Sequence, residues 1–113
     1  ARWAGKSKNF TIAIHKIEKE LLKVSATSKR SRRAHFCCAL SLAYPTGRIL
    51  SFEGKVYGHL NFPAVGNNGF GYDPIFIPDG YKKTFGEMNF LYKERISHRQ
   101  IAFNKLKNYL IKI

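Results

Sequence analysis

Apolar residues near the start of the chain recur at the spacing of an amphipathic helix. The intervals are four, three, four and three residues, at Phe10, Ile14, Ile17, Leu21 and Val24. This repeat follows the 3.6-residue period of an α-helix, so it predicts a helix over residues 7–24 with one apolar face. The lysines between these positions are expected to face water.

A strict alternation of large and small side chains follows over residues 34–44 and predicts a β-strand. The large residues share one face, at Phe36, Cys38, Leu40, Leu42 and Tyr44. The small residues share the other face, at Cys37, Ala39, Ser41 and Ala43. Neither face is strongly polar, so we expect the strand to be covered on both, as in the centre of a sheet.

A turn signal at residues 45–47 separates this strand from a second one over residues 49–60. Because the connection is short, the pair predicts a β-hairpin. Further along, a short strand is expected over residues 75–77, between two prolines, and one helical turn within residues 84–90.

The end of the chain predicts a second long helix, over residues 97–113. Ser97 and Gln100 form an S-x-x-Q capping box at its start. Its apolar stripe is formed by Ala102, Leu106, Tyr109 and Ile113.

The composition is that of a globular protein with a strong positive charge. The chain has 113 residues, of which 44% are hydrophobic, and no apolar run approaches the ~20 residues of a membrane span. It carries 20 lysines and arginines against 7 acidic residues, for a formal net charge of +13. An acidic partner is therefore expected, and nucleic acid, nucleotides and anionic membranes all fit this charge.

The two cysteines, Cys37 and Cys38, are adjacent, so in a strand they point to opposite faces and do not pair easily. We expect reduced, buried thiols in a cytosolic protein. No charged-then-apolar leader opens the sequence, which agrees with a cytoplasmic location and no membrane partner.

A polar connection over residues 25–33 carries Lys29, Arg30, Arg32 and Arg33. Such a basic loop is either a solvated surface or a nucleic-acid contact. Both interpretations stay open at this point.

Candidate chemistry begins at the run Gly69-Phe70-Gly71-Tyr72-Asp73-Pro74. Flanking glycines allow a close backbone approach to a ligand, and an exposed Phe70 could stack on a nucleic-acid base. Alternatively, the run is a tight turn with Phe70 in the core. Asp73 precedes a proline and is expected to be extended, where its carboxylate could accept hydrogen bonds from a ligand or cap a local turn.

Cations gather where the last helix begins. His98 and Arg99 lie in its first turn, and Lys93 lies just upstream. A helix N-terminus already carries partial positive charge and free N–H groups, so added cations are explained if an electron-rich acceptor binds there. The alternative is that these side chains are simply solvated.

These residues closely resemble the inosine/xanthosine triphosphate pyrophosphatases. The resemblance rests on Gly69 to Phe76, Glu87, Lys93 and Ser97-His98-Arg99, together with the opening Ala1-Arg2-Trp3-Ala4-Gly5, and it extends over the whole chain. It implies an α/β fold with an elongated mixed β-sheet and flanking helices, in a homodimer. It also implies a purine-base pocket formed by Phe70, Gly71, Tyr72, Asp73, Lys93, Ser97, His98 and Arg99.

Within that pocket, the resemblance implies that Phe70 stacks on the purine and that Lys93, His98 and Arg99 donate to ring acceptors. The implied reaction is Mg²⁺-dependent hydrolysis of a nucleoside triphosphate with a 6-oxo base (ITP, dITP or XTP) to the monophosphate and pyrophosphate. Hypoxanthine and xanthine accept hydrogen bonds at position 6, whereas adenine carries a donor there and would be rejected.

The segments that perform the chemistry in that family have no counterpart here. They are a phosphate-binding S/T-G-N-x-x-K loop, a metal-binding Glu and an Asp-Asp-Ser-Gly segment. A further difference lies at position 92, where this sequence has Tyr92 and the family usually has Glu. We therefore expect residues 1–113 to be a single partial domain, equivalent to a C-terminal portion. It would contain no catalytic residue and no Mg²⁺ ligand, and it would be inactive alone. The alternatives are half of a split enzyme, an inert remnant, or a basic nucleic-acid-binding module.

Overall fold

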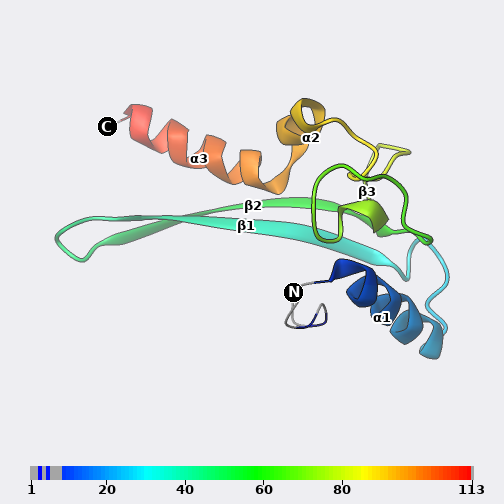
Figure 1. The fold of residues 1–113 in the computed structure, drawn as a ribbon. Coiled ribbons are helices and arrows are strands. Elements are labelled where there is room, and N and C mark those ends of the chain that lie inside the picture. Colours follow the sequence, from blue (N-terminus) through cyan, green and yellow to red (C-terminus); the bar gives the residue numbers. More distant parts are fainter. Residues whose placement is uncertain (1–2, 4, 6–8, 113) are drawn as a thin grey trace. The chain divides into compact units, whose positions relative to one another are not determined.

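The computed structural model describes residues 3, 5 and 9–112. They form α1 (Phe10–Lys23), β1 (Arg33–Ala43), β2 (Ile49–Leu60), β3 (Phe76–Pro78), α2 (Phe90–Ile96) and α3 (His98–Lys112) (Figure 1). The three strands form one sheet in the order β1-β2-β3, in which β2 and β3 are antiparallel. The expected α/β class, with helices flanking a sheet, is confirmed.

The chain divides into two compact units. The first unit comprises Ala1–Ala34 and Tyr57–Phe90, and the second comprises His35–Val56 and Leu91–Ile113. The strands β1 and β2 contribute residues to both.

In the first unit, α1 begins at Phe10 because the side chain of Asn9 caps it. Asn9 Oδ1 accepts a hydrogen bond from the N–H of Thr11 at 3.0 Å. Ile14 is buried, as the apolar stripe predicts, and so is its neighbour Ala13, but Val24 is 73% exposed just beyond the helix end. Placing Val24 on the buried stripe was wrong, and the predicted start of the helix, at residues 7 and 8, lies outside the described residues.

The core of the first unit forms around β3. Phe76 and Phe85 are buried, with ring centroids 5.2 Å apart, and Ile75 is buried beside them. Gly58 on β2 pairs with Pro78, and a Cβ at Gly58 would lie 2.2 Å from the carbonyl oxygen of Ile77. The short strand predicted between two prolines is therefore confirmed, shifted by one residue.

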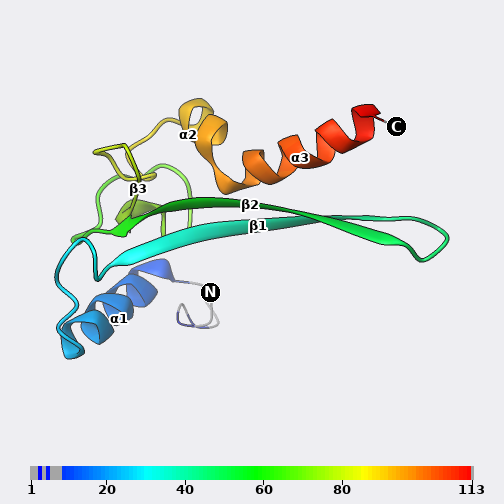
Figure 2. The same ribbon diagram turned by 180° about the vertical axis from the view of Figure 1, so that it is seen from behind.

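In the second unit, α3 runs along the hairpin (Figures 1 and 2). Gly54 on β2 allows a close approach, because a Cβ there would lie 2.1 Å from the carbonyl oxygen of His98. The ring of Tyr109 lies 5.6 Å from that of Phe52, and Lys105 Nζ donates to the carbonyl oxygen of Glu53 at 2.7 Å. One helix is thus packed directly on the backbone of β2.

The predicted burial of β1 on both faces is wrong for the part of the chain that the structure describes. Exposure alternates along the strand, so the large side chains are half-buried and the small ones, such as Cys37 and Ala39, are exposed. Both cysteines are free, as expected, but the Cys37 thiol is exposed rather than buried.

Helix α2 was not predicted from the sequence. The segment before it is a hydrogen-bonded turn, in which the N–H of Glu87 donates to the carbonyl oxygen of Thr84 at 3.1 Å. Across the described residues, every helix is too short or too polar to cross a membrane.

The predicted capping box of α3 forms only in part. Ser97 Oγ accepts from the N–H of Gln100 at 3.2 Å. The side chain of Gln100 donates instead to Asn104 Oδ1, at 3.0 Å.

Candidate functional site

The ring of Phe70 stands out from a loop of the first unit, with 65% of the residue exposed. Three glycines shape this loop by adopting positive φ: Gly66 at 98°, Gly69 at 74° and Gly71 at 63°. Residues with a Cβ rarely adopt this conformation, so the spacing of the glycines determines the course of the backbone. The alternative that Phe70 lies in the core is wrong.

The buried side chain of Asp73 holds this loop by a hydrogen bond to its backbone. Its carboxylate is buried, with the residue 4% exposed, and Oδ2 accepts a hydrogen bond from the backbone N–H of Phe70 at 3.0 Å. A Cβ at Gly69 would lie 2.1 Å from that oxygen, so glycine is needed there. Asp73 begins a 3-10 turn over Asp73–Ile75, and its predicted extended conformation is wrong. In this unit it caps a local turn.

Tyr72 and Gly71 rest against α1. The ring of Tyr72 meets that of Phe10 edge to face, with centroids 5.1 Å apart and planes at 88°. A Cβ at Gly71 would lie 3.7 Å from the same Phe10 ring. The first helical residue of α1 thus supports the loop that carries Phe70.

The other predicted site residues belong to the second unit. Lys93 lies within α2, the short helix that precedes α3, and is 5% exposed. Ser97 is 1% exposed and caps α3, while Arg99 is exposed. The ring of His98 lies 5.2 Å from that of Phe36. Four of the eight predicted residues therefore lie in each unit.

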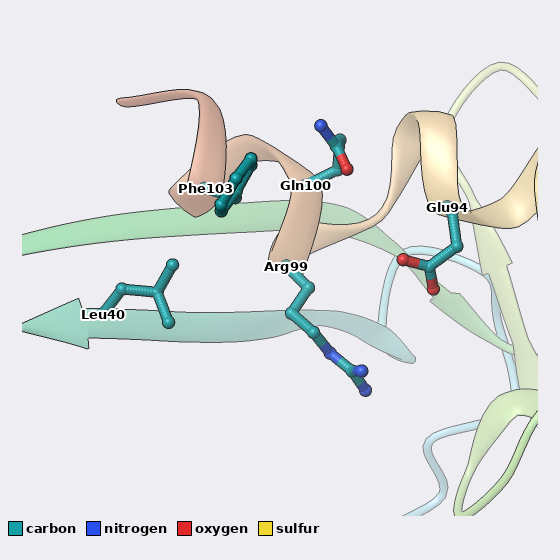
Figure 3. A pocket seen from close by; sticks show the side chains of 5 residues that line it. All are labelled: Leu40, Glu94, Arg99, Gln100 and Phe103. Carbon is teal, nitrogen blue, oxygen red and sulfur yellow. The ribbon is translucent and has the colours of Figure 1, made fainter. Parts of the chain in front are cut away.

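Arg99 also lines an open pocket of about 240 Å³ in the second unit (Figure 3). Glu94 lies on α2, Leu40 comes from β1, and Gln100 and Phe103 come from α3. These four residues were not predicted as site residues from the sequence. The spacing of Arg99 and Phe103, four residues apart on a helix, is a signal that could have found one of them.

Two of the four basic residues in the 25–33 connection have structural partners. The guanidinium of Arg32 lies 5.1 Å from the centroid of the Phe62 ring, and its Nε donates to the carbonyl oxygen of Ala26. Arg33 forms a bidentate ion pair with Asp79, in which Nη2 and Oδ2 lie 3.0 Å apart. Hydrogen bonding from Arg33 lowers the pKa of the exposed Asp79 carboxyl.

The described residues contain no group of three or more His, Cys, Asp or Glu side chains placed to hold a metal ion. Magnesium prefers carboxylate oxygens near the phosphates it neutralises. The described residues therefore do not fit such a site.

Solved structures identify the class of protein to which this fold belongs. The chain is similar to the Ham1 protein of Staphylococcus aureus, with a TM-score of 0.82 and 38% identity, over 96% of this chain and 54% of that one. It is also similar to a Ham1 protein from Coxiella burnetii, with a TM-score of 0.86 and 31% identity, over 99% and 56%.

The sequence gives the same assignment. Residues 1–109 match the model of the Ham1 family, and the chain belongs to that family. It is 49% identical over 107 residues to a dITP/XTP pyrophosphatase of Caulobacter vibrioides. The matched region covers 95% of this chain and 54% of that protein. For a dITP/XTP pyrophosphatase of Zymomonas mobilis the identity is 47% over 106 residues, covering 94% and 50%. The chain therefore spans about half the length of these relatives, and the resemblance to a portion of this family is confirmed.

Proposed function

We propose that this chain carries the base-recognition part of a nucleoside triphosphate pyrophosphatase that acts on 6-oxo purine nucleotides. The observation that carries the proposal is the exposed ring of Phe70 on a loop whose backbone is fixed by the buried Asp73. A base stacked on such a ring gains about 1–3 kcal/mol. The family assignment and the relatives named dITP/XTP pyrophosphatases support this substrate class.

Selectivity in this proposal comes from hydrogen-bond donors. Lys93, His98 and Arg99 would donate to the oxygens of hypoxanthine or xanthine. Adenine presents an amino donor at position 6, so binding it would leave cationic donors without acceptors in a desolvated site. A site built for one hydrogen-bonding pattern rejects the other strongly. Inosine and xanthosine nucleotides, with ribose or deoxyribose, all satisfy this rule.

The proposed reaction is attack of water on the α–β phosphate linkage, which releases the monophosphate and pyrophosphate. Catalysis of this kind depends on positioning and on neutralising phosphate charge, with Mg²⁺ supplying part of that charge. The chain has only seven carboxylates, and none of them occurs in a pair suited to this task. We therefore propose that Phe70 and its neighbours select the base, while residues outside this sequence perform the cleavage. Magnesium dependence and a homodimer remain predictions of the resemblance, and a cytoplasmic location remains a prediction from the unpaired cysteines.

Pyrophosphate release from ITP with Mg²⁺ tests whether this chain recognises the base without cleaving the phosphate linkage, with ATP as the control. The proposal predicts binding without turnover by this chain alone. ITP-selective turnover would show that this chain does contain catalytic groups, and that part of the proposal would be wrong.

The alternative of a nucleic-acid-binding module also remains a prediction. It relies on the basic 25–33 connection, where Arg32 and Arg33 already hold intramolecular partners. It predicts steep salt dependence of binding to oligonucleotides and no preference for a free 6-oxo nucleotide, whereas base recognition predicts the opposite.

A further inference from the structure

Two segments of the first unit are joined by a set of hydrogen bonds that we call the clasp. One segment is the loop of residues 65–74, which carries Phe70, and the other is the turn of residues 84–88. Thr84 Oγ1 donates to the carbonyl oxygen of Val65 at 2.6 Å, and Asn68 Nδ2 donates to that of Met88 at 3.0 Å. The N–H of Asn68 donates to the carbonyl oxygen of Gly86 at 2.9 Å, and the N–H of Gly86 donates to that of Asp73 at 3.0 Å. The loop is thus tied to the turn near both of its ends and at its middle.

Thr84 is a fully buried member of the clasp. It is 1% exposed, and its backbone N–H donates to Glu87 Oε1 at 3.0 Å while its hydroxyl reaches Val65. Both polar groups are therefore used, one to close the turn and the other to hold the loop. Removing this buried hydroxyl should lower stability, because the carbonyl oxygen of Val65 would be left without a donor.

The two segments also lie in direct backbone contact. A Cβ at Gly66 would lie 2.1 Å from the carbonyl carbon and oxygen of Gly86. A Cβ at Gly86 would lie 2.9 Å from the Cα of Pro74 and from the carbonyl oxygen of Val65. Because no side-chain layer separates the segments, a shift of the turn must be passed on to the loop.

We propose that Thr84 is a positioning residue for the base-stacking ring of Phe70, an inference that rests on the proposed function. Thr84 fixes the turn, Gly86 in that turn donates to Asp73, and Asp73 accepts from Phe70. The ring is thereby held outward before a base arrives. Such preorganisation reduces the ordering that binding must otherwise impose on the loop.

Hydrogen exchange of the full chain tests the clasp without any nucleotide. Thr84→Val removes the hydroxyl and keeps the shape, whereas Thr84→Ser keeps the hydroxyl as a matched control. We expect amide exchange at Asn68, Phe70 and Asp73 to rise by about five- to tenfold in Thr84→Val, and to return toward the wild-type rate in Thr84→Ser. Unchanged exchange in Thr84→Val would overturn the proposal.

A double-mutant cycle on ITP affinity tests whether the clasp acts through the ring. In the wild-type background, Thr84→Val should weaken ITP binding by about fivefold. In a Phe70→Ala background, the same change should have no further effect, because the ring it positions is gone. Equal losses in both backgrounds would show that Thr84 acts on stability alone and would overturn the proposal.

The two readouts separate the possible failures. If the wild-type chain binds ITP no better than ATP, the proposed function fails. The exchange rates then still decide whether Thr84 holds the Phe70 loop. If exchange rises in Thr84→Val while ITP affinity stays at the wild-type value, the clasp exists and its role in positioning the ring is wrong.

Discussion

Asp73 Oδ2 accepts a hydrogen bond from the backbone N–H of Phe70 at 3.0 Å, which joins a buried carboxylate to a residue that is 65% exposed. An exposed phenylalanine ring offers a flat apolar face on which a base can stack. Here the backbone beneath the ring is fixed by an internal acceptor and by glycines with positive φ. The ring is therefore presented to solvent by rigid structure.

Replacing Asp73 tests this anchor directly. Asp73→Ala should lower the free energy of unfolding by about 1–3 kcal/mol, because the N–H of Phe70 loses its buried acceptor. Asp73→Asn keeps an acceptor oxygen and should lose less. Urea unfolding of the three proteins measures the difference, and equal stabilities for Asp73→Ala and wild type would contradict the anchor.

The packing of α3 on β2 predicts that Gly54 cannot be replaced by a residue with a larger side chain. In Gly54→Ala the new Cβ would lie 2.1 Å from the carbonyl oxygen of His98 and 2.4 Å from the backbone nitrogen of Ala102. Overpacking of this kind should destabilise the protein by about 1–3 kcal/mol. Lys55→Ala, at the exposed neighbouring position, is the matched control and should change stability little. Thermal unfolding that is the same for both variants would argue against this contact.

His59 predicts a dependence of stability on pH. Burial, and then the charge of Lys29, lower its pKa below the ordinary value of 6.5, with Arg33 acting in the same direction and Asp79 opposing them. The folded protein therefore favours the neutral imidazole, and the unfolded chain takes up a proton more readily. Stability should be full above pH 6.5 and should fall as the pH drops from there toward the lower pKa of the folded state.

Unfolding by urea between about pH 7.5 and pH 5.5 measures this slope. His59→Gln removes the titrating group and should flatten the dependence in that range. The carboxyl of Asp79 is not the source of the slope, because its lowered pKa places its titration at more acidic pH. A slope that is identical in wild type and His59→Gln would contradict this assignment.

Much of the secondary structure follows from periodicity alone. The 3.6-residue repeat located α1 and α3, and the alternation from Phe36 onward located β1, because these patterns depend only on which side chains avoid water. Helix α2 was missed because it is only Phe90–Ile96 and begins with Phe90, Leu91 and Tyr92, all three exposed. Three consecutive apolar residues followed by three charged ones do not recur at the helical period, so the sequence carries no amphipathic signal there.

Candidate site residues were located by sequence, but their structural roles were not. Glycine spacing indicated a special backbone at Phe70, yet it did not decide between a core position and an exposed one. That choice depends on how the loop packs on the turn of residues 84–88, for example through the N–H of Asn68 on the carbonyl oxygen of Gly86, and such contacts are tertiary. The role of Thr84 was not foreseen either, because its hydroxyl bonds to Val65, 19 residues earlier.

The measurement that tests the central claim most directly is the equilibrium affinity for ITP and ATP, in wild type and in Phe70→Ala. Tyr57→Ala serves as the control, since Tyr57 is another exposed aromatic residue of the first unit. Base recognition predicts that wild type and Tyr57→Ala prefer ITP. It also predicts that Phe70→Ala loses about tenfold or more in ITP affinity. Equal affinity of the wild-type chain for the two nucleotides, or an ITP affinity that Phe70→Ala leaves unchanged, would contradict it.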